Sequence, residues 1–418
     1  MEEKTNLQRY WVGIDWGSEK HAVSIVDDRG IEQRHFAVFA TLEGLEVLDK
    51  TLRDIGMVAG VAIEATNNPV FYYLLERDYT IYPVNPKTSK RWREGNSVAG
   101  VKSDVRDGLV LAAELARRHE TQRVFQPEDP QTAKLRGLCE KQRTLIDHRT
   151  ALVQQIRQSL ACYYPAALEF FSDLTAPTVW AFLKRFPNPQ ELAKARKDTL
   201  LRFLKGRRIG LTPLWMKRIE QRVKATDWPL PPTALAEQLL VLACVVQLQA
   251  LQSALDKMQA LIEELIRPLP EAKLVRSLPG AGPKLTPALT AIIRSAAARA
   301  DNVQALRCLS GVAPVQEQSG KRNRTRIRRR CNKYLRNILH LYAWCSTRAC
   351  LWAKAYYELC KERGDSHATA LRKLADKWLR IIYRMLQTGQ PYEDSKYLKA
   401  LRKTHSPIWE RICGLPCA

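Results

Sequence analysis

In the segment Val12-Gly13-Ile14-Asp15, an apolar run leads directly into a carboxylate. A turn of small residues and an alternating segment, residues 21–26, follow it, which predicts two neighbouring strands. A second run, Val61-Ala62-Ile63-Glu64, also ends in a carboxylate. Carboxylates at the ends of buried strands lie at a sheet edge, where their oxygens can share a divalent cation. The two runs therefore predict a sheet with an acidic edge.

Asp104 and Asp107 extend this acidic set. They are three residues apart at the start of an amphipathic segment, so on a helix they share one face. Hydrophobic periodicity predicts the order βββαβαβ and then this helix, which is the order of a ribonuclease-H-like domain over residues 1–126. The expected elements are three strands within 11–40, a helix at 41–52, a strand at 57–64, a helix at 70–77, a strand at 80–84 and a helix at 103–119.

Each acid has an ordinary alternative role. Asp15 could simply end its strand, Glu64 could form an ion pair, and Asp104 could cap its helix, since Asp is a favoured N-cap residue. Together with the strand order, the set favours a metal site, because carboxylates gathered without a cation repel one another and their pKa values rise.

The charge of the chain is unevenly distributed. The 418 residues carry a net charge of +24, yet residues 1–100 contain 12 Lys or Arg and 15 Asp or Glu. The rest of the chain therefore carries +27, which favours a polyanionic partner that the basic part holds and the acidic part processes. We expect no segment with the roughly 20 apolar residues that span a bilayer, and the polar N-terminus lacks a signal peptide's apolar core. These features predict a cytoplasmic protein that does not act at a membrane.

The ten cysteines do not indicate a metal or disulfide framework. None is part of a C-x-x-C pair, and the closest spacings are Cys345/Cys350 and Cys413/Cys417. We expect reduced, mostly buried thiols that pack as small hydrophobic side chains. The sequence also has no P-loop pattern, which argues against an ATP-driven enzyme.

A long helical region follows a linker at residues 127–130 and extends to residue 270. A first long helix is expected from 132 to about 165, and the proline-rich segment 172–232 predicts short helices and loops. Apolar residues then recur at spacings of three and four: Val241, Cys244, Leu248, Leu251, Leu255, Met258, Ile262 and Leu265. This repeat is typical either of an amphipathic core helix or of a coiled-coil stalk, formed with the 132–160 helix, with another subunit, or with both.

Residues 271–365 form a further predicted module, and a helical tail covers 366–418. The module opens on Leu278-Pro279-Gly280-Ala281-Gly282-Pro283, followed by an apolar helix at 285–293. Such a turn resembles a helix-hairpin-helix, in which backbone N–H groups around Gly280 and Gly282 hold a DNA phosphate. It could equally be an ordinary turn between two helices.

Ser319 opens a strongly basic loop. Residues 321–336 contain nine Lys or Arg and no acid, a density that favours phosphate binding over a solvated face. Ser319 could be a turn residue, as Ser-Gly usually is; as a nucleophile it would need activation by metal ions or arginines. The candidate nucleic-acid-binding residues of this loop are Lys321, Arg322, Arg324, Arg326, Arg328, Arg329, Arg330, Lys333 and Arg336.

These motifs, in this order, resemble the DEDD transposases of bacterial insertion sequences, the insertion sequence 110 family with its Piv-type DNA invertases. The motifs are GIDWGS with Asp15, AIEAT with Glu64, KSDVRDG with Asp104 and Asp107, LPGAGP, GVAPVQEQSGK with Ser319, and NKYLRNIL. The resemblance implies a RuvC-like domain, a helical stalk and a transposase domain that share one active site. It also implies that Asp15, Glu64, Asp104 and Asp107 bind Mg²⁺ and that Ser319 is the nucleophile. Family members cut and rejoin DNA through a covalent phosphoserine, guided by a structured RNA.

The sequence departs from this family pattern at three places. Cys331 replaces a usual glycine, Gly108 replaces an alanine, and the middle segment 165–235 is longer.

The expected partners are donor and target DNA, a guide RNA and further copies of the chain in a dimer or tetramer, in the bacterial cytoplasm. Two other functions stay open: a RuvC-like nuclease that hydrolyses branched DNA or an RNA–DNA hybrid, and a non-catalytic nucleic-acid-binding protein.

Overall fold

The chain folds into two compact units, residues 1–127 and 128–418, which are described separately. The computed structural model describes residues 8–64, 68–96, 104–207, 209, 212–221, 230–300, 302–320 and 322–414. Lys321, one of the predicted binding residues, lies outside these ranges. For Asp104, Ser319 and Arg322 the description covers the backbone alone.

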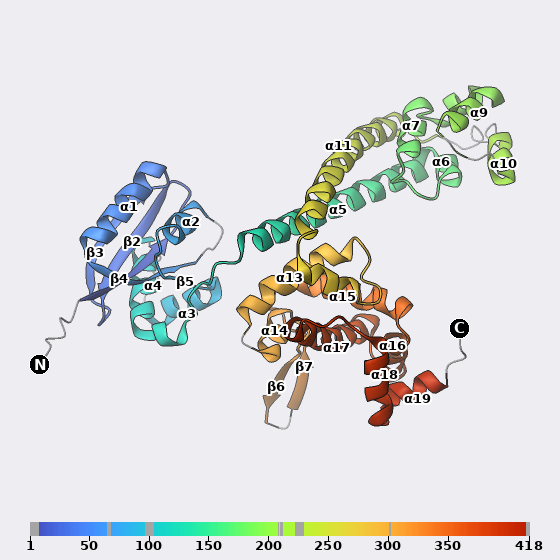
Figure 1. Ribbon diagram of the computed structural model, residues 1–418. Coiled ribbons are helices and arrows are strands. Elements are labelled where there is room, and N and C mark those ends of the chain that lie inside the picture. Colours follow the sequence, from blue (N-terminus) through green and yellow to red (C-terminus); the bar gives the residue numbers. More distant parts are fainter. Residues whose placement is uncertain are drawn as a thin grey trace, which may run out of the picture. The chain divides into compact units, whose positions relative to one another are not determined.

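The first unit is a mixed sheet with helices (Figure 1). The strand order is β3-β2-β1-β4-β5, in which β1, β2 and β3 pair antiparallel and β4 and β5 run parallel to β1. The elements are β1 (Arg9–Asp15), β2 (Lys20–Asp27), β3 (Glu32–Phe39), α1 (Leu42–Asp54), β4 (Met57–Ile63), α2 (Pro69–Leu75), β5 (Ile81–Pro83), α3 (Pro86–Asn96) and α4 (Asp104–Arg118).

Each face of this sheet has its own buried core, because successive side chains of a strand point to opposite faces. Val12 and Ile14 of β1 belong to the core that also contains Leu48 of α1. Trp11, which alternates with them along β1, belongs to the other core, with Leu111 of α4. The sheet is therefore covered on both sides, and the strand ends are fixed between two packed layers.

The predicted order of elements is confirmed, with one omission. The strands and helices follow as βββαβαβ and then α4, but an additional helix, α3, lies between β5 and α4. Its start has the signature of a helix N-terminus: Asn85 Oδ1 accepts a hydrogen bond from Lys87 N at 3.0 Å, and Pro86 is the first helical residue. The Asn85-Pro86 pair is the feature of the sequence from which α3 could have been predicted.

The second unit begins with two long helices that pair antiparallel (Figure 1). Side-chain hydrogen bonds join the start of one helix to the end of the other: Gln131 donates to Leu265 O, Gln142 to Gln259 and Arg149 to Gln252. The elements of this part are α5 (Pro130–Tyr163), α6 (Pro165–Phe170), α7 (Pro177–Arg185), α8 (Pro189–Lys194), α9 (Lys197–Gly206), α10 (Pro213–Gln221) and α11 (Ala234–Ile266).

The apolar repeat of α11 faces α5 of the same chain. Val241, Cys244, Leu248, Leu255 and Ile262 are buried, and the other three residues of the repeat are partly buried. Pairing with the 132–160 helix is thus confirmed, whereas a coiled coil with another subunit stays a prediction. Short helices α6 to α10 close the far end of the pair, as the prolines predicted, around an aromatic core that includes Phe171 and Phe182 with ring centroids 4.9 Å apart.

The expectation that no segment could span a bilayer needs correction. Within the described ranges, α11 is long and apolar enough to cross a membrane, by length and composition alone. Its apolar surface is only partly covered, since Leu235, Leu239 and Val246 remain exposed. The helix is more apolar than its pairing with α5 requires.

The remaining part of the second unit is mostly helical. Its core contains closely packed aromatic residues, with the tilted rings of Trp352 and Trp378 4.6 Å apart between centroids. Trp378 Nε1 donates to Ser346 Oγ at 2.8 Å, so this buried polar group is satisfied. The elements are α12 (Pro270–Arg276), α13 (Leu285–Arg299), α14 (Val303–Leu309), β6 (Val315–Ser319), β7 (Arg322–Arg326), α15 (Lys333–Ala349), α16 (Leu351–Glu362), α17 (His367–Thr388), α18 (Asp394–Lys403) and α19 (Pro407–Cys413).

The nine described cysteines are all free, as expected. Only Cys139, Cys244, Cys350 and Cys360 are buried, so the expectation of mostly buried thiols is wrong. Burial raises the pKa of Cys139 to about 12 and that of Cys350 to about 12, which keeps both thiols protonated. The division of 128–418 into stalk, transposase domain and tail stays a prediction.

Candidate active site

The positions of Asp15 and Glu64 follow directly from the pairing of β1 with β4. These strands run parallel, and Ile14 lies opposite Ile63. Asp15 is the last residue of β1 and Glu64 is the first residue after β4. The two carboxylates therefore lie at the same edge of the sheet, on neighbouring strands, as the sequence predicted.

A close backbone contact brings α4 to this edge. A Cβ atom at Gly13 would lie 2.1 Å from the carbonyl oxygen of Gly108 and 2.5 Å from the nitrogen of Ala112, so only glycine fits. The crossing of α4 over β1 is fixed two residues before Asp15 and one residue after Asp107. Asp107 is 5% exposed. This contact is the physical reason why an acid on a helix stands near acids at strand ends.

Arg93 of α3 joins two of the predicted metal ligands, and sequence reasoning missed it. Its Nη1 lies 2.5 Å from Asp107 Oδ2, and its Nη2 lies 4.0 Å from Glu64 Oε1. Both carboxylate side chains are largely buried, at 6% and 21% exposed. The guanidinium supplies the positive charge that two neighbouring buried carboxylates require.

The described side chains do not themselves form a complete metal cage. Among them, no group of three or more His, Cys, Asp or Glu residues is close enough to hold a metal ion. Asp104, the first residue of α4, lies one helical turn before Asp107, but its side chain is outside the description. The oxygen donors nevertheless fit a hard divalent cation, because Arg93 already marks a place where positive charge between Glu64 and Asp107 is stabilised.

His21 shapes the turn that follows Asp15. Its ring Nδ1 accepts a hydrogen bond from Gly17 N at 3.3 Å, and the residue is 4% exposed. Burial lowers the pKa of His21 below its ordinary value. A neutral imidazole with Nδ1 as acceptor therefore holds the turn between β1 and β2, and adds no positive charge to the acidic edge.

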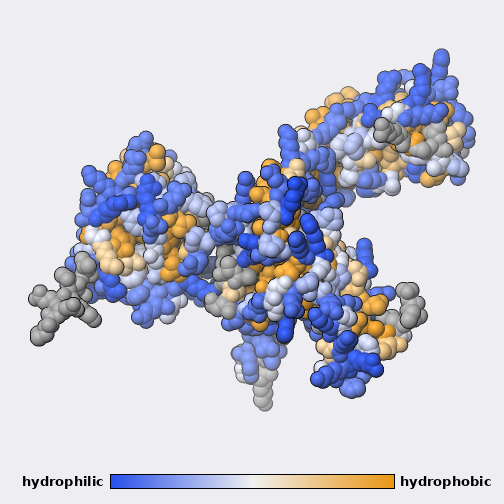
Figure 2. Space-filling view, viewed as in Figure 1, coloured by the Kyte–Doolittle hydropathy of each residue, from blue (hydrophilic) through white to orange (hydrophobic). Residues whose placement is uncertain are grey.

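Ser319 lies at the tip of a β-hairpin, where the sequence predicted a loop. Strands β6 and β7 pair antiparallel, with Ser319 opposite Arg322 and Gly320 in the turn at φ 55°. Glu317 and Arg326 pair across the hairpin at 2.9 Å. The described surface of the hairpin is hydrophilic in Figure 2. A polar hairpin without an apolar face has no hydrophobic periodicity from which its strands could be predicted.

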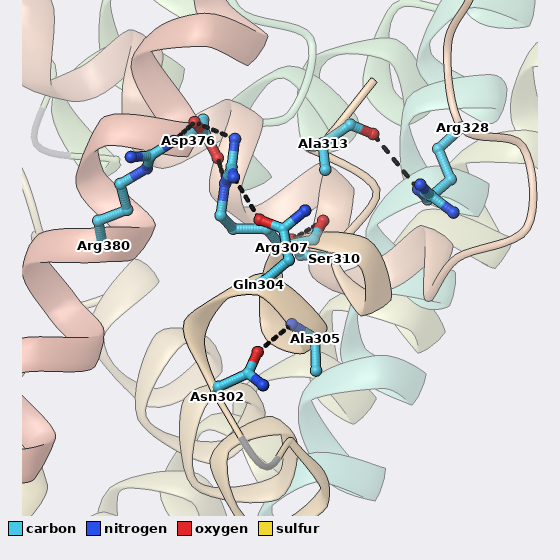
Figure 3. A network of polar contacts seen from close by, with 9 residues as sticks. All are labelled: Asn302, Gln304, Ala305, Arg307, Ser310, Ala313, Arg328, Asp376 and Arg380. Carbon is cyan, nitrogen blue, oxygen red and sulfur yellow. Dashed lines mark hydrogen bonds and ion pairs between the residues drawn. The ribbon is translucent and has the colours of Figure 1, made fainter. Parts of the chain in front are cut away.

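The base of the hairpin is tied to the helices by backbone carbonyls. Arg328 Nε donates to Ala313 O at 3.4 Å, which Figure 3 shows, and Arg336 Nη1 donates to Arg328 O at 3.1 Å. Cys331 packs against Gly311, where a Cβ atom would lie 2.5 Å from its sulfur. Arg328 and Arg336 therefore have a structural role, in addition to any contact with phosphate.

Five of the predicted binding residues are exposed to solvent. Arg326 is already paired with Glu317, whereas the other four form no ion pair within the described ranges. The five residues are Arg324, Arg326, Arg329, Arg330 and Lys333. The basic segment is thus divided into arginines that hold the hairpin and cations that face outward.

The Gly280–Gly282 turn joins α12 to α13, which fits both a helix-hairpin-helix and an ordinary turn between two helices. Gly280 has φ 82°, and a Cβ atom there would lie 2.9 Å from the backbone of Cys345 in α15. Gly282 faces open space, and its carbonyl accepts from Leu285 N at 3.0 Å. Gly280 is therefore required for packing, and Gly282 is the one available to a ligand.

Two protein-family models match the chain in the regions that contain the candidate residues. A DEDD transposase model of the IS110 group matches residues 12–165, a range that contains all four predicted carboxylates. A second model, described as transposase IS116/IS110/IS902 family, matches residues 272–358, which contain Ser319. The two models cover the two regions in which the candidate residues lie.

Three relatives match along nearly the whole chain. The "mini-circle putative transposase for IS117" of Streptomyces coelicolor is 30% identical over 92% of this chain and 95% of the relative. An insertion element IS116 protein of Streptomyces clavuligerus is 26% identical over 92% and 96%, and an insertion element IS900 protein of Mycobacterium paratuberculosis is 24% identical over 92% and 97%. The chain therefore belongs to the IS116/IS110/IS902 family of transposases, enzymes that cut and rejoin DNA.

Proposed function

We propose that the N-terminal unit is a RuvC-like catalytic domain and that the chain transfers DNA strands with a Mg²⁺-bound acidic tetrad and a serine nucleophile. The observation that carries this proposal is the meeting of Glu64 and Asp107 on Arg93, beside the end of β1 that bears Asp15. Acids from two strands and one helix at one sheet edge are the donor set that phosphodiester chemistry with divalent cations uses.

Asp15, Glu64, Asp104 and Asp107 would hold the metal. Mg²⁺, when bound, neutralises charge on the scissile phosphate and activates the attacking oxygen. The buried environment of Asp107 supports this role, since electrostatic interactions are stronger where water is excluded. Arg93 would then have two tasks: it balances the carboxylates before the metal arrives, and it contacts a phosphate oxygen afterwards.

Ser319 would attack phosphorus. Its Oγ forms a new ester bond while the bond to one DNA oxygen breaks, and the serine proton ends on the departing DNA hydroxyl. Attack by the hydroxyl of another DNA end reverses these changes, joins the strands and restores the serine. The exposed tip of a hairpin rich in arginine supports this assignment, because cations nearby favour the serine alkoxide.

Arg324, Arg329, Arg330 and Lys333 would bind the phosphates of DNA and of a structured guide RNA. Their exposure and lack of ion pairs in the described ranges support this role. Lys321 and Arg322 would extend the same surface, and Gly282 would contact a phosphate through its backbone. Nucleic acid held by the second unit would be processed by the acids of the first, in the bacterial cytoplasm.

The active form would be a homo-oligomer. The exposed apolar residues of α11, among them Leu235, Leu239 and Val246, support a contact between copies, because soluble chains rarely leave such a face uncovered. Mixing Ser319→Ala protein with Asp15→Ala protein tests this point. Recovered strand transfer would show that one subunit supplies the serine and another the acids.

A cleavage assay with and without metal tests the proposed function. Asp15→Asn, Glu64→Gln and Asp107→Asn proteins should each fold and bind DNA but fail to cut it, and EDTA should have the same effect on the wild-type protein. Wild-type cleavage that persists in EDTA would contradict the metal site. The rival function, a water-using nuclease, predicts metal-dependent cutting that survives Ser319→Ala.

A further inference from the structure

A cavity of about 390 Å³ lies in the second unit, apart from the residues proposed for strand transfer. Its walls come from α16, α17, α18 and the segment 312–314 that leads into β6. The lining combines cations with apolar and aromatic groups: Val312, Pro314, Tyr356, Lys377, Arg380 and Tyr397.

The acid in this cavity is already neutralised. Asp376 accepts hydrogen bonds from Arg307 Nε at 2.5 Å and Nη2 at 2.9 Å, and Arg380 Nη2 lies 3.2 Å from the same carboxylate. Figure 3 shows Asp376 between these two arginines. A bidentate partner satisfies Asp376, so Arg380 adds positive charge to the cavity.

Lys377 adds a further positive charge to the lining of the cavity. It forms no ion pair with a described carboxylate, and its Nζ lies 4.7 Å from the centre of the Tyr356 ring. Burial lowers the pKa of Lys377, and the neighbouring Arg380 lowers it further, while Asp376 and Cys360 oppose the shift only in part. A half-buried ammonium group between an aromatic ring and a second cation is costly unless an anion accompanies it.

We infer that this cavity binds one unpaired nucleotide of a nucleic-acid strand, with its phosphate on Lys377 and Arg380 and its base against the apolar wall at Tyr397 and Val312. The volume suits a ligand of nucleotide size. Cations beside aromatic rings are the combination that holds single strands without reading sequence. A bare anion would leave the apolar wall unused.

The cavity lies beside the segment that leads into the hairpin. Val312 and Pro314 line it, and Val315 begins β6, the strand that ends at Ser319. A strand held here would be anchored at the base of the hairpin. Binding at this cavity does not depend on the strand-transfer chemistry proposed above, so each can be tested without the other.

Binding of full-length protein to oligothymidylate, to the matching oligouridylate and to a duplex tests the site. Lys377→Ala should weaken single-strand binding about tenfold, the size expected for one charge-assisted contact. The slope of log affinity against log salt should fall by about 0.7, because one phosphate is no longer neutralised. Duplex binding should change less. Lys354→Ala, which removes the same charge from an exposed position on α16, is the control. It should leave the affinities for oligothymidylate, oligouridylate and duplex unchanged.

Lys377→Arg should restore most of the binding, since it keeps the charge, and this excludes a folding defect as the cause. Photocross-linking with 4-thiouridine in the oligouridylate, and with 4-thiothymidine in the DNA, should label peptides that contain Tyr356 or Tyr397. The stronger label identifies RNA or DNA as the source of the nucleotide. Equal losses for Lys377→Ala and Lys354→Ala, or a label confined to other peptides, would overturn the inference. So would competition by inorganic phosphate or an acidic peptide as effective as competition by the oligonucleotide.

Discussion

The acidic edge of the first unit and the hairpin of the second are built on opposite principles. At the acidic edge, Asp107 is almost fully buried and its helix is fixed by a backbone contact that tolerates no side chain at Gly13. At the hairpin, most described side chains are exposed, and a Cβ atom at Gly320 would meet nothing within 4 Å. Under the proposed function, the acids would need a fixed geometry to hold a metal, whereas the serine would need to reach a polymer from an exposed element.

The difference can be tested first by activity, where the largest effect is expected. Glu64→Gln or Asp107→Asn should reduce DNA cleavage about a thousandfold or more, because a metal ligand contributes several kcal/mol to the transition state. Arg324→Ala, on the exposed hairpin, should reduce it far less. Cleavage rates on one DNA substrate measure both. If Arg324→Ala lost as much cleavage activity as Glu64→Gln or Asp107→Asn, the acidic edge and the hairpin would not differ in their importance for cleavage.

The second test compares two glycines by thermal or denaturant unfolding. Gly13→Ala should lower the free energy of unfolding by about 2–3 kcal/mol, because the new methyl group overlaps Gly108 and Ala112 of α4. Gly320→Ala should cost only about 1 kcal/mol, the strain of a left-handed residue in open space.

Gly137→Ala provides the control for these glycines. It lies within α5 with nothing near its Cβ position, so alanine should stabilise the protein by about 0.5–1 kcal/mol. If Gly13→Ala is as mild as Gly320→Ala, the contact between β1 and α4 is not what fixes the acids.

The third test asks how much Arg93 stabilises the neighbouring carboxylates of the acidic edge. Arg93→Ala should lower the free energy of unfolding by about 1–2 kcal/mol, between the values for exposed and buried pairs, because it leaves Asp107 without its partner. Mg²⁺ should then raise the melting temperature of the variant more than that of the wild type. Arg53→Ala removes an exposed pair with Asp49 and should show no such difference. An identical Mg²⁺ effect on wild type and Arg93→Ala would count against the proposed metal site.

The smallest effect is expected for the outward-facing cations. Replacing Arg329 and Arg330 with Ala should leave stability unchanged and lower the salt slope of duplex binding by about 0.9 for each phosphate that the variant no longer neutralises. Arg336→Ala should instead destabilise the hairpin, since it removes the donor to Arg328 O. Affinities measured over a series of salt concentrations separate the two. An unchanged slope would show that Arg329 and Arg330 do not bind phosphate.

The two regions also differ in what the sequence could predict. The runs that end at Asp15 and Glu64 are apolar and regular, so the order of the elements along the chain and the acidic strand ends follow from pattern alone. Helix α3 is short and polar, which hid Arg93, although Asn85-Pro86 marked its start. The hairpin has no apolar periodicity, and Ser319 was therefore placed in a loop.

Contacts between residues that are far apart in the chain could not be predicted from the sequence. The fit of Gly13 against Gly108, and the packing of Cys331 against Gly311, depend on which backbones meet in space. Local patterns predict elements and their exposed or buried faces, but they do not state which glycine touches which helix. The departure at Cys331 is thus explained by the structure, in which its sulfur packs on a glycine with φ 71°.

In the proposed function, the serine of the exposed hairpin completes the chemistry of the buried acids. Reaction of the full-length protein with a nicked DNA substrate in Mg²⁺, followed by denaturation and mass spectrometry of the protein–DNA adduct, tests it most directly. We expect a phosphoester between DNA and Ser319 that is absent from Ser319→Ala and from Asp15→Asn proteins, while both variants still bind DNA. Wild-type cleavage by Ser319→Ala protein without any covalent adduct would contradict it and assign the attack to water.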